Sequence, residues 1–151
     1  MRNRKINFED SISLICESLA GGQNVIFSPR GESMLPTIKE GRDKVTLSPA
    51  PEKLKRGDIV FYKRDNGQFV LHRVVSARRG YVFCGDSQFS LERGIKKEQI
   101  IAICSHINRG GKDIYSGSLL WKLFAARAGF ARFFRRGYHG LRSRAAKIVK
   151  K

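Results

Sequence analysis

The chain has 151 residues, 41% of them hydrophobic, which suffices for one domain with a buried core and an appended segment. Thirty Lys and Arg against thirteen Asp and Glu give a net charge of +17, which indicates an anionic partner: a membrane, a nucleic acid or an acidic protein. The chain has no run of about 18 apolar residues and no apolar secretory stretch near the N-terminus, so we expect a cytoplasmic protein without a spanning helix.

The cysteines argue against a disulfide framework and against a zinc site. Cys16, Cys84 and Cys104 are an odd number, and none forms a CxxC spacing. They suit buried thiols in a reducing compartment. The sequence therefore predicts no metal and no cofactor.

The first element in chain order is a helix over residues 7–20. Apolar residues recur there at spacings of three and four, and Gly21 and Gly22 end the pattern. Its simplest role is to cover one side of the domain.

Residues 24–108 change to short apolar runs separated by turn residues, which is typical of a β domain. The expected strands cover residues 25–28, 44–47, 59–62, 69–75, 81–84 and 100–107. Asn66-Gly67 is typical of a hairpin turn, because these residues tolerate positive φ angles. We predict a mainly β fold, a coiled sheet or barrel over residues 23–113, with an N-terminal helical segment at 1–22 and a tail at 114–151.

The tail is predicted to be a basic amphipathic helix. It contains ten basic residues and no acidic one, so residues 1–113 carry 20 − 13 = +7 of the net charge of +17. At helical spacing, an apolar face that includes Leu120, Leu123, Phe130 and Phe134 lies opposite Lys122 and other basic residues. Such a helix favours binding to an anionic membrane surface. Packing on the domain or on a second subunit, and nucleic-acid binding, are the alternatives.

Ser33 lies in a turn-forming stretch, Gly-Glu-Ser-Met-Leu-Pro at residues 31–36, directly after an expected strand. Gly31 permits a sharp turn and Pro36 fixes its own φ angle. Such a turn holds one hydroxyl at the end of a sheet, although the same pattern occurs in ordinary loops.

A serine hydroxyl needs a neighbouring base to act as a nucleophile. Among the three histidines, His72 lies within an apolar strand, where alternation places it on the same face as Val70 and Val74. Asp86 follows the next strand and offers a carboxylate to orient the imidazole. A structural histidine and a turn aspartate are the alternative interpretations of these two residues.

Four sequence blocks resemble the type I signal peptidase family in order and spacing. They are the stretch at 31–36, Arg-Gly-Asp-Ile-Val-Phe at 56–61, Leu-His-Arg-Val-Val at 71–75 and Cys-Gly-Asp at 84–86. In the bacterial branch of that family a lysine acts as the base, and His72 occupies this position here. A second branch uses histidine as the base, and this sequence resembles that branch. The resemblance implies that Ser33 is the nucleophile, His72 the general base and Asp86 the orienting acid. A second acidic position of that branch falls near Glu92.

The resemblance also implies a substrate and how it binds. The substrate would be an extended peptide or preprotein, paired to the backbone between Gly31 and Glu32 on one side and Phe69, Val70 and Leu71 on the other. Cleavage would follow small residues. The Ser33 amide would hold the oxyanion together with a second donor, which Gly31 does not supply with a side chain.

Members of that family usually have an N-terminal transmembrane anchor, and no apolar run long enough to form one is expected in this sequence. We expect the basic tail to hold the protein peripherally on a membrane and the substrate to be a cytosolic precursor with a leader peptide. The alternative function is a non-catalytic module on the same fold that binds a membrane surface or nucleic acid.

Overall fold

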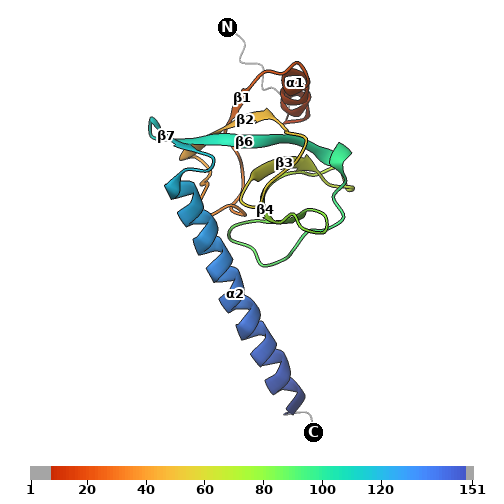
Figure 1. Ribbon diagram of the computed structural model, residues 1–151, viewed down its shortest axis with the longest axis vertical. Coiled ribbons are helices and arrows are strands. Elements are labelled where there is room, and N and C mark those ends of the chain that lie inside the picture. Colours follow the sequence, from red (N-terminus) through yellow and green to blue (C-terminus); the bar gives the residue numbers. More distant parts are fainter. Residues whose placement is uncertain (1–7, 149–151) are drawn as a thin grey trace.

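The computed structural model describes residues 8–148, with side chains over residues 11–134. Its centre is a seven-stranded antiparallel sheet in the order β1-β2-β6-β3-β4-β5, with β7 paired to β6 (Figure 1). The strands are β1 (Val25–Phe27), β2 (Asp43–Pro49), β3 (Ile59–Lys63), β4 (Phe69–Ser76), β5 (Val82–Cys84), β6 (Ile100–Arg109) and β7 (Lys112–Tyr115). Helix α1 (Phe8–Ala20) precedes the sheet and α2 (Leu119–Ile148) follows it, with the short 3-10 turn η1 (Lys97–Gln99) before β6. The prediction of a mainly β fold flanked by two helices is confirmed.

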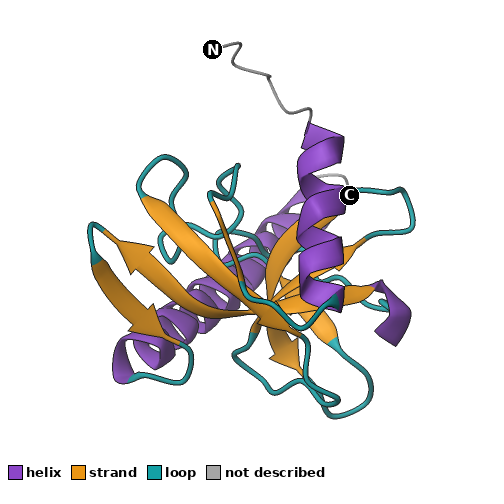
Figure 2. Cartoon of the chain, turned by 90° about the horizontal axis from the view of Figure 1, so that it is seen from above, coloured by secondary structure: helices purple, strands orange, loops and turns teal. Residues whose placement is uncertain are grey.

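The sheet is not closed, so the barrel alternative is wrong. The strands at the two ends of the sheet, β1 and β5, have three residues each and do not pair with one another. A closed barrel requires its first and last strands to pair, and these two do not. The sheet is coiled and open, as Figure 2 shows from above.

Strand β7 was absent from the prediction, in which the last strand covered residues 100–107 and the domain ended at residue 113. Gly110 and Gly111, with φ angles of 58° and 85°, turn the chain back so that β7 pairs with β6. The sheet therefore continues to Tyr115, two residues into the segment that the sequence assigned to the tail.

Alternation along β4 divides the core as predicted. Leu71 packs with Phe61 in a large cluster that also contains Ile12 of α1 and Trp121 of α2. Val70 and Val74 belong to a second cluster with Tyr62. Consecutive residues of β4 therefore point to opposite faces of the sheet.

Helix α2 begins against the sheet and then runs beyond it (Figure 1). Within residues 8–148 no helix combines the length and the apolar character needed to cross a bilayer.

Candidate active site

Ser33 lies in the turn between β1 and β2. The Leu35 N–H donates to the Glu32 carbonyl at 3.1 Å, and the Ile38 N–H donates to the Met34 carbonyl at 2.9 Å. Met34 is buried in the large core cluster, while Ser33 itself is only half-buried. The neighbouring apolar side chain thus anchors the turn and leaves the serine near the surface.

The turn carrying Ser33 rests on the segment that follows β5. The Ser87 N–H donates to the Ser33 carbonyl at 3.0 Å, and the Ser87 hydroxyl donates to the Glu32 carbonyl at 2.7 Å. A Cβ atom at position 85 would lie only 2.5 Å from the Ser33 carbonyl oxygen. Gly85 therefore permits a backbone contact that any larger residue would obstruct.

His72 is buried on β4 and is held by two side chains from other elements. Its Nδ1 lies 3.1 Å from Oε1 of Glu92 and 3.3 Å from the hydroxyl of Tyr62. The same hydroxyl donates to Oε2 of Glu92 at 2.9 Å. A neutral imidazole beside a carboxylate carries its proton on Nδ1, which leaves the Nε2 lone pair as the proton acceptor.

Glu92 is fixed through both its backbone and its side chain. It exchanges two backbone hydrogen bonds with Phe83 of β5, of 2.9 and 2.8 Å. Arg64 binds both carboxylate oxygens, through Nε at 2.9 Å and through Nη2. Burial raises the pKa of Glu92, but the hydrogen bonds from Arg64 and Tyr62 outweigh it and leave the pKa below its ordinary value. Glu92 is therefore an anion at neutral pH.

Burial lowers the pKa of His72 below its ordinary value of 6.5, although the nearby Glu92 carboxylate acts in the opposite direction. The ring is consequently neutral at pH 7, which is the form that can accept a proton.

Asp86 has different partners from the one predicted. Arg73 donates to Oδ1 through Nε at 2.8 Å and to Oδ2 through Nη2 at 2.7 Å, and the Thr37 hydroxyl also donates to Oδ2. Arg73 directly follows His72 on β4 and so points to the opposite face of the sheet. Within residues 8–148, no hydrogen bond joins Asp86 to His72; the carboxylate beside the imidazole is that of Glu92.

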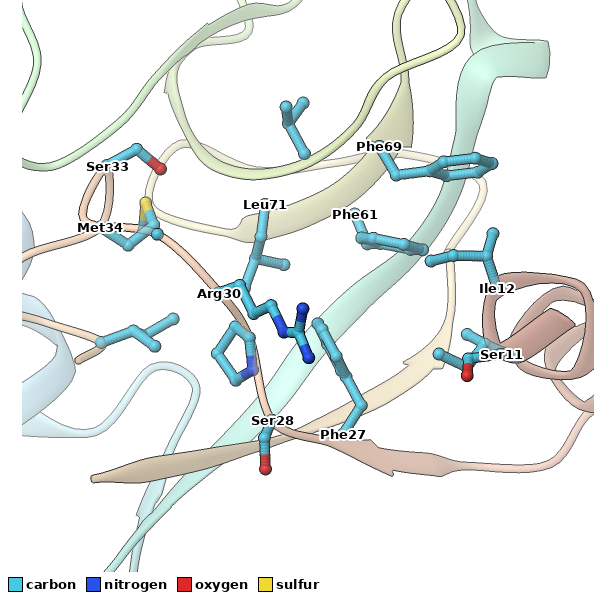
Figure 3. A pocket seen from close by; sticks show the side chains of 15 residues that line it. Ser11, Ile12, Phe27, Ser28, Arg30, Ser33, Met34, Phe61, Phe69 and Leu71 are labelled. Carbon is cyan, nitrogen blue, oxygen red and sulfur yellow. The ribbon is translucent and has the colours of Figure 1, made fainter. Parts of the chain in front are cut away.

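A cleft of about 680 Å³ opens beside Ser33. Of the residues predicted to bind substrate, Gly31, Phe69, Val70 and Leu71 line this cleft, whereas Glu32 is exposed outside it. Figure 3 shows Ser33 at one end of the cleft and Ile12 of α1 at the other.

Three aromatic rings lie side by side in the cleft lining. The ring of Phe61 lies 5.8 Å from that of Phe27 and 5.8 Å from that of Phe69, measured between centroids. One backbone edge of residues 69–71 pairs with β3, while β5 pairs with β4 only from Arg73 onward. Over the described chain, the other edge of residues 69–71 has no strand beside it and remains open to an extended peptide.

The structure therefore places Ser33 and β4, the strand that carries His72, at the same cleft, but the Ser33 hydroxyl and the His72 imidazole do not pair there. Val70 and Leu71 of the strand line the same cleft as Ser33. In the part of the chain that the structure describes, no hydrogen bond joins Ser33 to His72. Such contacts often form only when substrate is bound.

A second oxyanion donor is not apparent at Gly31. Its N–H donates to Oε2 of Glu40 at 2.7 Å and is thus already paired.

Among the described residues, no group of three His, Cys, Asp or Glu side chains is placed to hold a metal ion. The three cysteines are free thiols, and burial raises the pKa of Cys104 to about 12.

Sequence reasoning missed the residues that hold the site together. Tyr62 was predicted only as part of an apolar strand, and Arg64 was not singled out at all. An aromatic hydroxyl at the end of a buried strand needs a polar partner, and this was the available signal for Tyr62.

No family model and no curated protein matches this sequence.

Proposed function

We propose that this protein is a serine endopeptidase in which Ser33 is the nucleophile and His72 the general base. The observation that carries the proposal is the contact between His72 Nδ1 and the Glu92 carboxylate, 3.1 Å apart, on the strand whose Val70 and Leu71 line the same cleft as Ser33. A buried, neutral imidazole whose Nδ1 faces a carboxylate has the tautomer that general-base catalysis requires.

In the proposed reaction, Ser33 Oγ attacks the peptide carbonyl carbon and transfers its proton to His72 Nε2. Glu92 stabilises the imidazolium that forms, and this cation then gives the proton to the departing amine as the C–N bond breaks. Water, deprotonated by the same imidazole, hydrolyses the Ser33 ester and restores the hydroxyl. Glu92 thus takes the role that the sequence assigned to Asp86.

Asp86 has a positioning role in this account. Its ion pair with Arg73 and its bond from Thr37 connect β4 to the chain just after the Ser33 turn. The Gly85 and Ser87 backbone on either side of Asp86 contacts the Ser33 carbonyl. The buried pair therefore supports the surface on which the nucleophile rests.

The proposed substrate is an extended peptide that pairs with the open edge of residues 69–71. The apolar cleft lining favours apolar side chains on that peptide. Cleavage after small residues, and a precursor with a leader peptide as the natural substrate, follow from the resemblance to signal peptidases and remain proposals.

The test is cleavage of a mixed-sequence peptide library, with products identified by mass spectrometry. We expect wild type to cut the library, Ser33→Ala to lose that activity and the exposed Ser90→Ala, a matched control, to retain it. Equal thermal unfolding of the three proteins excludes a folding defect. Equal cleavage by Ser33→Ala and wild type, or no cleavage by a folded wild type, contradicts the proposal and favours a non-catalytic module.

A further inference from the structure

The first half of α2 presents an apolar face to solvent. Large apolar side chains recur there at helical spacing, and all of them are exposed: Leu119, Leu120, Leu123, Phe130, Phe133 and Phe134. Phe133 is 74% exposed and Phe130 67%, values far above those of core residues. Contiguous exposed apolar side chains of this size mark interaction surfaces rather than ordinary protein surface.

The opposite face of the same helix is already docked on the domain. Trp121 is 2% exposed, and its Nε1 donates to the Gly57 carbonyl at 3.0 Å. Ala128 is buried, and Arg132 donates to the Gly85 carbonyl at 3.4 Å. These contacts fix the rotation of the helix about its own axis. The exposed apolar face therefore cannot turn inward while the Trp121 side stays in place.

This arrangement corrects one residue of the predicted apolar face and shows where the opposite face lies. The sequence placed Arg132 opposite the apolar face, and the structure shows that this side of the helix is docked on the domain. Phe124 was placed on the apolar face, yet it is half-buried beneath Arg109, whose guanidinium carbon lies 5.5 Å from the ring. Packing on the domain and exposure of an apolar face occur together, on opposite sides of one helix.

The charge of α2 indicates which kind of partner the exposed apolar face binds. Residues 119–148 contain Lys and Arg but no Asp or Glu. Lys122 and Arg127 are exposed on the same part of the helix as the apolar side chains. An interfacial helix buries Leu and Phe among lipid chains while Lys and Arg reach anionic headgroups. A nucleic-acid duplex would satisfy the charges but would leave the three phenylalanines in water.

We propose that the face formed by Leu119, Leu120, Leu123, Phe130, Phe133 and Phe134 docks on an anionic lipid bilayer, with α2 lying in the interface. The domain is then carried on the Trp121 side of the helix, away from the lipid. Arg132 joins the docked helix to Gly85, whose backbone adjoins Ser33, so the proposed active site is held close to the membrane surface. This inference does not depend on catalysis.

The test measures binding of the full-length chain to vesicles of equal parts phosphatidylglycerol and phosphatidylcholine, and to vesicles of phosphatidylcholine alone. We expect binding to the anionic vesicles that weakens as salt is raised. The triple variant F130S/F133S/F134S should bind at least about tenfold more weakly, because the apolar part of the face is lost. The charge variant K122E/R127E should also bind the anionic vesicles more weakly than wild type does. Its binding to vesicles of phosphatidylcholine alone should equal that of wild type.

A matched control replaces apolar side chains exposed elsewhere. Leu14 of α1 and Ile26 of β1 are 56% and 67% exposed, and L14S/I26S should bind vesicles as wild type does. Trp121, the single tryptophan, reports through its fluorescence that α2 remains docked in every variant.

Three results would overturn the proposal. The first is equal vesicle binding by wild type and F130S/F133S/F134S with unchanged Trp121 fluorescence. The second is binding to duplex DNA without binding to anionic vesicles. The third is a wild-type protein that forms a dimer in solution and does not bind vesicles, together with a triple variant that is monomeric. The face would then be a contact between two copies of the chain.

Discussion

The carboxylate of Glu92 lies 3.1 Å from Nδ1 of His72, and the hydroxyl of Tyr62 contacts both groups. This relationship gives a buried imidazole a defined tautomer and a nearby anion. Without Glu92 the burial of His72 would favour the neutral ring but would not direct its proton. The four predictions below follow from this arrangement and from the surface that supports Ser33.

Replacing Glu92 by Gln should lower kcat by about 10²-fold or more, because the imidazolium loses its stabilising anion and the ring loses its fixed tautomer. KM should change little, since Glu92 does not line the cleft. Steady-state kinetics on a cleaved peptide measures both constants. Glu98→Gln, at an exposed position, is the matched control, and an unchanged kcat in Glu92→Gln would exclude the proposed role.

Activity should depend on pH through His72. The base works only when neutral, and burial lowers its pKa below 6.5. We therefore expect kcat/KM to be constant near pH 7 and to fall with decreasing pH at a midpoint below 6.5. In Glu92→Gln the midpoint should move still lower, because the carboxylate that raises the His72 pKa is gone. A midpoint above 6.5 would show that a different group is titrating.

The substitution Asp86→Asn should lower the free energy of unfolding. It removes the charge that pairs with the buried guanidinium of Arg73, and breaking such a pair costs about 3–5 kcal/mol. Urea unfolding measures the loss, and Glu52→Gln, at an exposed position, should cost far less. An Asp86→Asn protein as stable as wild type would show that the ion pair between Asp86 and Arg73 does not support the fold.

Gly85→Ala should reduce activity by displacing the Ser33 turn. The new methyl group would lie 2.5 Å from the Ser33 carbonyl oxygen and 2.9 Å from the Gln88 side chain. Gln88 is a side chain that can move, but the Ser33 backbone must shift. Gly129→Ala is the control, because a Cβ there meets nothing within 4 Å. Equal kcat/KM in the two variants would show that the Ser33 turn does not depend on this contact.

Strands β1 to β6 were predictable because each has a local signature. Alternation along β4 and the Asn66-Gly67 turn placed His72 and its face correctly, and Gly67 does adopt a positive φ of 85°. Strand β7 was missed because Lys-Asp-Ile-Tyr is short and half charged, and it forms only by pairing with β6.

Side-chain partners far apart in the chain were harder to predict. Asp86 and Glu92 are both acidic and both follow β5, so sequence spacing does not decide which one meets His72. The choice depends on the isolated bridge between Glu92 and Phe83 and on the competing Arg73, which are tertiary features. The rotation of α2 likewise depends on the bond from Trp121 to Gly57, which helical periodicity does not reveal.

The most direct test of the central claim is detection of a covalent acyl group on Ser33. Wild type would be mixed with a peptide ester, quenched in acid and digested, and the modified fragment located by mass spectrometry. We predict an acyl group on Ser33 in wild type and none in Ser33→Ala. An adduct on another residue such as Cys16, or turnover of the ester with no adduct that depends on Ser33, would contradict the assignment of the nucleophile.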